Sequence, residues 1–364
     1  MGFAFIKETH IDFVGQRYKA YVLSVLFLAG ALVSMILGGG PRMGIDFAGG
    51  VIVQVQFQQP VHDEALKNSL DAGHLPGLST QRFGEGGRDY LLRFSTTDIP
   101  AQELRDGVLG VLKTAFPGNA AEIARLEMVG PKVGADLAQK ALEALYYAVL
   151  LIAVYISGRF EQRWLAAAVM AAALWGGVYV VGLFGVGTGA LVLVALGITL
   201  AVSWRLKLNF AFGAVVGLLH DVFITLGILS VLGKEIDLNV VAALLTLAGY
   251  SLNDTIIVYD RIRENLRKDP EYDLSAVIND SVNQTLSRTL LTGGTTFVAV
   301  LALFLLGGGV IHDFALTMLV GVVIGTLSSI YVSAPILLAL GTGEQYASIR
   351  QRQDYEKPGE HGIV

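Results

Sequence analysis

The sequence predicts an α-helical polytopic membrane protein of about eight spans, with one extracytoplasmic α+β domain of the ferredoxin-like type. Three observations lead to this fold class. Of the 364 residues, 53% are hydrophobic and only 16% are charged, whereas soluble domains carry about 25% charged residues. Apolar runs of membrane-crossing length recur along the chain. The interval between the first two runs, residues 41–137, shows instead the short alternating segments typical of strands.

The charge and the residue types exclude several kinds of site. The net charge of −5 is spread along the chain, without the basic patch that nucleic acid requires. There are no cysteines, which excludes disulfides, thiolate catalysis and cysteine-bound metals. The six histidines lack the spacing of a metal-binding motif. We therefore expect a protein that is not an enzyme, with no metal and no cofactor, in a lipid bilayer.

Eight apolar runs are candidate spans, because about 20 helical residues cross the hydrocarbon core. They are residues 21–38, 138–157, 164–186, 188–204, 208–232, 239–259, 289–307 and 313–340. The run 188–204 is the weakest, since its 17 residues are at the short limit for a crossing helix. If it does not cross, the span count becomes odd and the orientation predicted below fails.

Basic residues set the predicted orientation. The first run lacks a small-residue cleavage site, so it is interpreted as a retained anchor rather than a signal peptide. With residues 1–20 in the cytoplasm, most basic residues near the spans also fall on the cytoplasmic side, as the positive-inside rule requires. They are Arg159, Arg163, Arg205, Lys207, Arg261, Arg263, Arg267, Lys268, Arg288, Arg350 and Arg352, against Lys234 alone in the short outer loops. The tail 341–364 is therefore cytoplasmic as well.

The interval 41–137 has the pattern of a small α+β domain. Alternating, helix-compatible and Gly- or Pro-containing segments follow one another in the order βαββαβ, which is that of a ferredoxin-like domain. The predicted elements are strand 50–57, helix 62–71, strands 80–83 and 90–94, helix 100–116 and strand 121–129. A turn at Gly84–Gly87 separates the two central strands. We expect this domain to lie outside the membrane and to have no active site.

An ionisable pair, His220-Asp221, lies in the middle of the fifth run. A charge at this depth costs roughly 3 kcal/mol on insertion scales, which anchoring alone does not require. Gly213, Gly217, Asp221 and Thr225 are four residues apart and share one helix face. This face is either a packing seam of small residues with a hydrogen-bonded aspartate, or the site of a carboxylate that loads and releases protons.

A candidate counter-charge, Arg288, lies directly before the seventh run. Four hydroxyl residues share its helical face: Ser281, Thr285, Thr292 and Thr296. Arginine stays protonated, so Arg288 could pair with a carboxylate when that carboxylate is ionised. The alternative is a snorkelling anchor at the cytoplasmic surface.

The sixth and last runs contain further acids. Asp254 lies about one and a half turns inside the cytoplasmic end of the sixth run. Asp260 and Arg261 lie at that end, a position that favours a structural ion-pair cluster. His312-Asp313, at the outer end of the last run, repeats the His-Asp pair. With two instances we interpret the repetition as coincidence.

Several stretches together resemble SecF members of the SecD/SecF family, the accessory membrane subunits of bacterial protein export. The stretch 43–50, Met-Gly-Ile-Asp-Phe-Ala-Gly-Gly, is similar to the signature that opens the family's exported domain. The other similar stretches, in the family's order, are Leu218–Asp221, Ala248–Thr255, Tyr259–Asn265, Gln284–Thr289, His312–Ala315 and Ser328–Ile330.

The resemblance implies partners and an energy source. SecF pairs with SecD in a bundle of the resistance–nodulation–division type that acts with the Sec translocon channel. The pair uses the proton gradient to assist translocation and release of unfolded secretory proteins. The implied location is the bacterial cytoplasmic (inner) membrane, and sodium remains open as the coupling ion.

The resemblance also assigns residues. It makes Asp221 and Arg288 the first proton-relay candidates, with Asp254 and Asp260 secondary and His220 beside Asp221. The signature residues of the exported domain are Gly44, Asp46, Phe47, Gly49 and Gly50.

One departure from the family is the span count within the bundle 138–340. The family has six spans, so 164–204 is interpreted as an inserted helical hairpin, which preserves the orientation on both sides. A small-molecule or lipid exporter of the same superfamily and a structural scaffold for SecD remain as alternatives. An intramembrane aspartyl protease is disfavoured, because the GxGD partner motif is absent.

Overall fold

The computed structural model describes residues 9–38, 40–73, 78–83, 86–94, 100–161, 164–184, 186–268 and 273–342. Arg163, the first two residues of the Gly84–Gly87 turn, residues 1–8 of the N-terminal segment and residues 343–364 of the tail lie outside the described residues.

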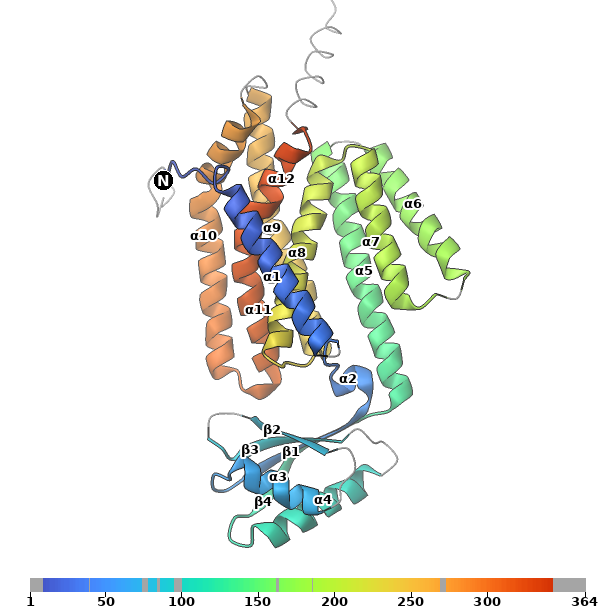
Figure 1. Ribbon diagram of the computed structural model, residues 1–364, viewed down its shortest axis with the longest axis vertical. Coiled ribbons are helices and arrows are strands. Elements are labelled where there is room, and N and C mark those ends of the chain that lie inside the picture. Colours follow the sequence, from blue (N-terminus) through green and yellow to red (C-terminus); the bar gives the residue numbers. More distant parts are fainter. Residues whose placement is uncertain are drawn as a thin grey trace, which may run out of the picture.

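A bundle of long helices stands above a small α+β domain (Figure 1). Seven helical segments are long and apolar enough to cross a membrane, and an eighth, α7, is apolar but shorter. The helices of the bundle are α1 (Arg17–Leu37), α5 (Pro131–Glu161), α6 (Trp164–Gly182), α7 (Thr188–Arg205), α8 (Asn209–Val231), α9 (Leu238–Lys268), α10 (Leu274–Leu306) and α11 (Gly309–Ser328). Each of the eight predicted runs therefore lies in a helix, and seven of these segments have membrane-crossing length.

The last crossing segment is not a uniform α-helix. After α11 the chain forms a π-helical turn, η1 (Ser329–Ser333), and then α12 (Ala334–Ala339). Insertions of this kind are rare and are frequent at functional sites. Sequence periodicity did not predict the π-helical turn, because this segment is apolar around most of its circumference and so has no marked pattern for an extra residue to shift.

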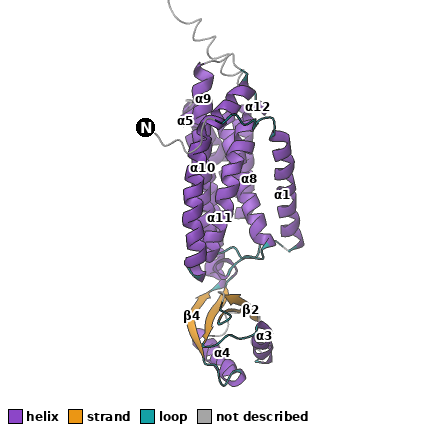
Figure 2. Cartoon of the chain, turned by 90° about the vertical axis from the view of Figure 1, so that its left-hand side faces the viewer, coloured by secondary structure: helices purple, strands orange, loops and turns teal. Residues whose placement is uncertain are grey.

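The elements of the α+β domain are β1 (Gly50–Phe57), α3 (Asp63–Ala72), β2 (Leu78–Phe83), β3 (Asp89–Phe94), α4 (Ala101–Ala115) and β4 (Ala121–Val129). The strands form one antiparallel sheet in the order β2-β3-β1-β4. Val51, Val53 and Val55 point to one face and pack in a core with leucines of α3 and α4. These helices cover the face away from the bundle, so the other face is turned toward it (Figure 2).

Helix α5 joins the domain to the bundle without a break. It begins at Pro131, directly after β4, and is 31 residues long, so it starts before the predicted span 138–157. Helices α6 and α7 form a hairpin packed on α5, at the side of the bundle away from α10 (Figure 1). Apolar side chains such as Leu165 and Trp175 are exposed on this hairpin, as expected for contact with lipid.

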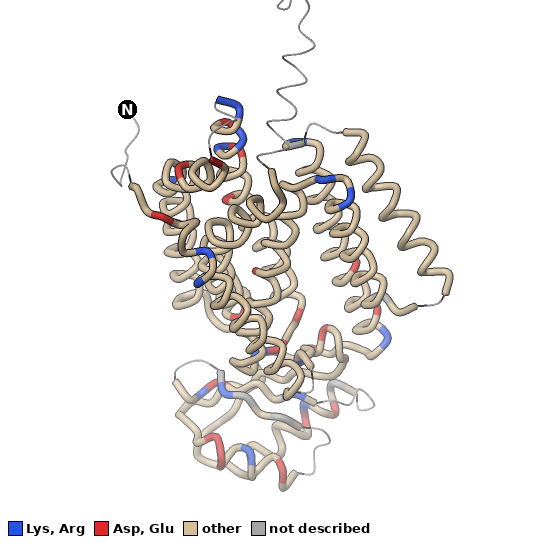
Figure 3. The backbone as a smooth tube through the Cα atoms, turned by 45° about the horizontal axis from the view of Figure 1, so that its top comes forward, with Lys and Arg blue, Asp and Glu red and all other residues tan. Residues whose placement is uncertain are grey.

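Lys and Arg residues of the bundle gather mainly at the end away from the α+β domain (Figure 3). The described chain also starts and ends there, since α1 begins and α12 ends at that end (Figure 1). This arrangement places the most basic loops together, at the pole opposite the sheet.

Candidate functional site

Asp221 is sealed inside the bundle at the meeting point of three helices. Its side chain on α8 has 0% exposure. Ser251 on α9 and Ser328 on α11 donate hydrogen bonds to its Oδ2 at 2.5 and 2.8 Å. The Nδ1 atom of His220 lies 2.9 Å from its Oδ1. Two hydroxyls and an imidazole thus compensate a carboxyl group that the apolar surroundings would otherwise leave unpaired.

The predicted polar face of α8 packs closely on η1 and α9. A Cβ atom at Gly217 would overlap the Ser333 side chain, and one at Gly213 would overlap the Tyr259 hydroxyl. Tyr259 in turn donates a hydrogen bond to the Ser333 carbonyl at 2.9 Å. The small residues therefore serve a packing function, while Asp221 on the same face has a hydrogen-bonded cluster of its own.

The lack of a side chain at Gly325 lets α11 pack closely against the Asp221 cluster. A Cβ there would lie 3.0 Å from Ser251 Cβ and 3.5 Å from Asp221 Oδ2. Three residues further on, Ser328 reaches the carboxylate, and η1 begins at the next residue. The π-helical turn therefore directly follows the residue by which the last segment contacts Asp221.

Asp254 forms a second buried acid site, between α9, α10 and α11. Its side chain is 1% exposed, and Thr292 of α10 lies 3.5 Å from its Oδ1. Its Oδ2 and the hydroxyls of Tyr250 and Thr326 make no hydrogen bond of ordinary geometry among the described residues, although Thr326 interacts with Asp254 and Thr296 with Tyr250. The Asp254 carboxylate thus has spare hydrogen-bonding capacity, whereas both carboxylate oxygens of Asp221 have partners.

Arg288 interacts electrostatically with Asp254. No contact among the described residues joins Arg288 to Asp221, the first-ranked carboxylate in the sequence analysis. Arg288 is itself exposed on α10. The structure therefore joins His220 to Asp221 in direct contact, and it leaves Arg288 within electrostatic range of Asp254 without a hydrogen bond or ion pair between them among the described residues.

Asp260 lies at the end of α9 away from the domain, in contact with solvent. Its Oδ2 accepts from Arg159 Nη2 of α5 at 3.3 Å, with both side chains more than 40% exposed. The buried Arg263 donates to the Arg159 carbonyl at 3.1 Å, and Arg261 pairs with Glu264 at 2.9 Å. An ion-pair cluster is present, but Asp260 pairs with Arg159 rather than with Arg261. This placement favours a structural role over a proton relay.

The signature 43–50 forms the joint between the domain and the bundle. Gly49 and Gly50 have φ angles of +76° and +131°, which side-chain-bearing residues rarely adopt. A Cβ at Gly44 would lie 3.1 Å from Asp237 Cβ, and the Phe47 carbonyl lies against Gly134 of α5. These residues need to be small because three chain segments meet here.

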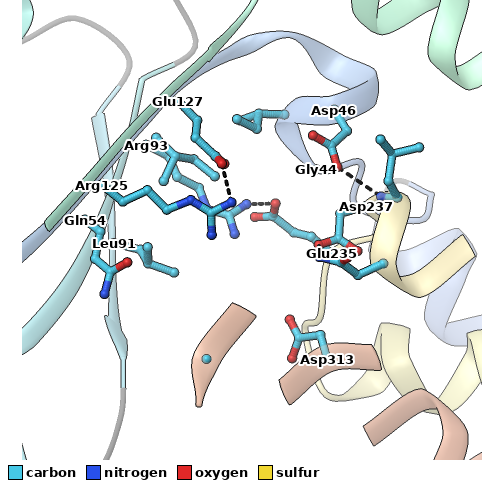
Figure 4. Close-up of a pocket in the computed structure, with 15 residues that line it drawn as sticks. Gly44, Asp46, Gln54, Leu91, Arg93, Arg125, Glu127, Glu235, Asp237 and Asp313 are labelled. Atoms are coloured by element: carbon cyan, nitrogen blue, oxygen red, sulfur yellow. Dashed lines mark hydrogen bonds and ion pairs between the residues drawn. The ribbon is translucent and has the colours of Figure 1, made fainter. Parts of the chain in front are cut away.

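The loop from α8 to α9, residues 232–237, is the bundle's side of this joint. The backbones of Gly44 and Ile236 are hydrogen-bonded at 2.8 Å. Lys234 in the loop pairs with Asp313 of α11 at 2.6 Å. Glu235 pairs with Arg93 of β3 (Figure 4). One short loop therefore contacts the signature, the sheet and α11, and connects the helices that carry Asp221 and Asp254.

A cavity of about 290 Å³ opens between this loop and the open face of the sheet. Basic side chains from the sheet face acidic side chains from the bundle (Figure 4). Burial lowers the pKa of Arg93 and raises the pKa of Asp237. Arg93 and Glu235 were not predicted from the sequence, because single charges in a strand and a loop form no local motif. The described residues contain no group of three or more His, Asp or Glu placed to hold a metal ion.

Comparison with known protein families identifies the chain. The model described as protein export membrane protein SecD/SecF, C-terminal, matches residues 111–188 and 176–343, and the SecD/SecF GG motif matches residues 35–61. The chain belongs to the SecD/SecF family. The GG-motif match contains the signature 43–50. The two C-terminal matches overlap in 176–188, within the hairpin interpreted as an insertion.

Curated relatives and solved structures agree with this assignment. The chain is 41% identical over 344 residues to the protein translocase subunit SecF of Magnetococcus marinus, covering 94% of this chain and 95% of that protein. It is 38% identical over 350 residues to SecF of Escherichia coli O157:H7, covering 96% and 92%. The crystal structure of SecDF from Thermus thermophilus superposes with a TM-score of 0.67 at 30% identity, covering 94% of this chain.

The SecDF chain is much longer than this one. The match covers 40% of it, and a second SecDF structure, in the super-membrane-facing form, is covered to 41% with a TM-score of 0.57. The SecD/SecF resemblance predicted from sequence motifs is confirmed. Its SecF relatives and the SecDF structures show that the chain is an accessory subunit of the Sec translocase.

Proposed function

We propose that this chain pairs with SecD in the bacterial inner membrane and that the pair uses the proton-motive force to assist translocation and release of secretory proteins. The observation that carries the proposal is the buried Asp221, which is held by groups from α9, α11 and its own helix. A carboxyl group inside a membrane bundle is costly and marks ion or proton pathways.

The position of Asp221 suits coupling. Protonation changes its hydrogen-bonding from acceptor-only to donor and acceptor. Because its partners lie on α9 and α11, that change alters contacts between three helices. Two of these helices, α8 and α9, end in the loop that contacts the α+β domain, so a rearrangement around Asp221 has a short structural route to the domain.

The proposed orientation puts the α+β domain on the outer side. The basic loops lie at the opposite pole (Figure 3), and the positive-inside rule assigns that pole, with both termini, to the cytoplasm. The domain and the cavity beneath its sheet would then meet secretory chains as they leave the translocon channel. SecD is the proposed partner, because the solved SecDF chains match this chain over about two fifths of their length.

Export of a secreted precursor tests the proposal. Cells depleted of their own SecF would receive this chain with its own SecD, as wild type, Asp221→Asn or Ser34→Ala, at matched expression. Ser34 is the control, because among the described residues its hydroxyl contacts only that of Ser230, near the domain-side end of the bundle. We expect rescue by wild type and Ser34→Ala, and loss of gradient-dependent export with Asp221→Asn.

Equal rescue by Asp221→Asn would remove the carboxylate from the mechanism and favour a scaffold for SecD. The other alternative, an exporter of small molecules or lipids, predicts a change in drug or lipid efflux instead. Measuring efflux in the same strains separates the two outcomes.

A further inference from the structure

Helix α1 packs unevenly on the bundle. In its domain-side half, Ala31 is buried against Gly227 of α8, where even a Cβ would overlap it. Ser34 and Ser230 are 3.2 Å apart in the same region. In its other half, two cavities lie between α1 and the adjoining parts of α8, α11 and η1. Helix α1 is therefore packed tightly on α8 at its domain-side end. At its other end a gap, called the wedge below, lies between α1 and the rest of the bundle.

Two cavities flank α1 in this wedge. One of about 260 Å³ lies toward α11, and one of about 430 Å³ lies toward α7 and α8. They share three lining residues, Ser24, His220 and Val332. His220 thus lies beneath α1 at the point where the two cavities meet.

The His220 ring lies between Asp221 and the wedge. Its side chain is 9% exposed, and its Nδ1 contacts Asp221 Oδ1 at 2.9 Å. Its Nε2 is buried without a hydrogen-bond partner among the described residues. An unpaired ring nitrogen in a membrane interior costs free energy unless water or another polar molecule reaches it.

A few polar groups lie in the wall of the smaller cavity, most of which is apolar. Hydroxyls of Ser24, Ser328 and Tyr331 line it together with His220, and Gln16 and Lys19 line it near the start of α1. Water needs two to four polar partners to occupy such a space. No carboxylate lines this cavity, and the only charged side chain there is Lys19. The larger cavity is lined mostly by apolar side chains as well, and of these polar residues it shares only Ser24 and His220.

We propose that His220 transfers protons between Asp221 and water in the smaller cavity, which opens toward the cytoplasmic end of α1. This inference rests on the proposed function and specifies the side of the membrane to which Asp221 is connected. Protonated Asp221 gives its proton to Nδ1 while Nε2–H gives its proton to a water molecule. The imidazole stays neutral overall, and the original tautomer returns when the rotated ring loses the Nδ1 proton to water and takes up a proton from water at Nε2.

The groups facing this route are few. Besides Asp221, the titratable side chains around the ring are Lys19 of α1 and Tyr331 of η1 in the smaller cavity, and Tyr21 of α1 in the larger one. A lipid chain could fill the same space, but it would leave Nε2 unpaired. The two occupants therefore differ in whether water reaches Ser24.

Water access is measured directly, because the chain has no cysteine. Ser24→Cys would be compared with Leu26→Cys, an exposed position two residues away that lines neither cavity. The complex with SecD in inverted vesicles is treated with a charged, membrane-impermeant thiol reagent. Because the thiolate is the reacting species and needs water to form, we expect Ser24→Cys to react about tenfold faster or more. Equal, slow labelling would show a lipid-filled wedge and overturn the proposal.

Proton flux tests the route itself. In proteoliposomes containing the complex with SecD, we expect His220→Gln and the cavity-filling Ala20→Leu to lower gradient-driven proton flux by about tenfold or more. Ala29→Leu, an exposed position on α1 that lines neither cavity, should leave the flux unchanged. Normal flux in His220→Gln and Ala20→Leu with loss in Asp221→Asn would refute this route and leave the proposed function intact. Normal flux in Asp221→Asn would refute both.

Discussion

Asp46 Oδ2 accepts a hydrogen bond from the backbone N–H of Leu238 at 3.0 Å, across 192 residues of sequence. Leu238 is the first residue of α9, whose leading N–H groups have no partner within the helix. The carboxylate therefore caps α9 and complements its dipole. Through this bond, the helix that carries Ser251 and Asp254 is tied to the base of the α+β domain.

Removing this cap should loosen the start of α9. We expect Asp46→Ala to destabilise the protein by about 1 kcal/mol, and Asp46→Asn, which keeps an acceptor oxygen, by less. Hydrogen exchange of the amides at residues 238–241 measures the effect. Asp106→Ala, at an exposed acid on α4, is the control. Unchanged exchange in Asp46→Ala would show that Asp237, which accepts from Val240 at 2.8 Å, is sufficient as the cap.

The Arg93–Glu235 pair should couple the sheet to the bundle. The two side chains are only 20% and 25% exposed, so removing one leaves the other buried without its partner. We expect Arg93→Ala and Glu235→Ala each to destabilise the protein more than half as much as the double variant, with a coupling energy of about 1–2 kcal/mol. Thermal unfolding of the four proteins of the cycle measures it. Simple additivity of the single variants would contradict the pairing.

The serines around Asp221 should act together. Ser251→Ala or Ser328→Ala removes one hydrogen-bond donor, which we expect to cost about 1–2 kcal/mol. The double variant leaves Oδ2 with neither hydroxyl, so its loss of gradient-dependent export should exceed the sum of the single losses. Export assays at matched expression check this. Single variants without effect on either stability or export would mean that the cluster tolerates rearrangement.

Arg288 should be needed for the state in which Asp254 is ionised. We expect Arg288→Ala to assemble with SecD but to lose gradient-dependent export, since Asp254 then lacks its counter-charge. Arg288→Lys, which keeps the charge, should retain part of the activity. Arg267→Ala, at an exposed cation near the end of α9, should behave like wild type. Failure of Arg288→Ala to assemble would favour an anchoring role instead.

Tyr90 should make the domain sensitive to alkali. Its hydroxyl donates to the Val61 carbonyl at 2.5 Å and to Asp63 at 2.7 Å. Burial and the hydrogen bond to Asp63 raise the pKa of Tyr90 from 10.0 to about 12. A raised folded-state pKa means that its stabilising contribution is complete below pH 10 and disappears as the pH rises toward about 12.

Replacing Tyr90 tests whether stability falls with rising pH in the predicted direction. We expect Tyr90→Phe to destabilise the domain by about 1 kcal/mol at neutral pH and to lose less stability than wild type between pH 10 and 12. Hydrogen exchange of β3 and α3 in the intact protein reports the effect. A parallel decline of both proteins with pH would exclude Tyr90 as the titrating group.

Local patterns predicted much of the architecture. Each apolar run lies in a helix of the bundle, and the order of elements between β1 and β4 matches the predicted βαββαβ order. The length of an apolar run and its periodicity depend only on neighbouring residues, so both can be recognised without knowledge of the fold. The π-helical turn and the early start of α5 were not predicted, because the last run is apolar around most of its circumference and the first residues of α5, which include Lys132 and Asp136, lie outside the apolar run.

The sequence by itself determined the membrane class, the α+β interval and the presence of a His-Asp pair at mid-span, since composition, run length and spacing are local quantities. The tertiary structure decided which groups meet. Asp221 bonds to Ser251 and Ser328, which are 30 and 107 residues away. Arg93 pairs with Glu235, and Arg288 lies within electrostatic range of Asp254. These pairings depend on how each helix is rotated and packed against its neighbours, which is fixed only when distant segments close around a common core.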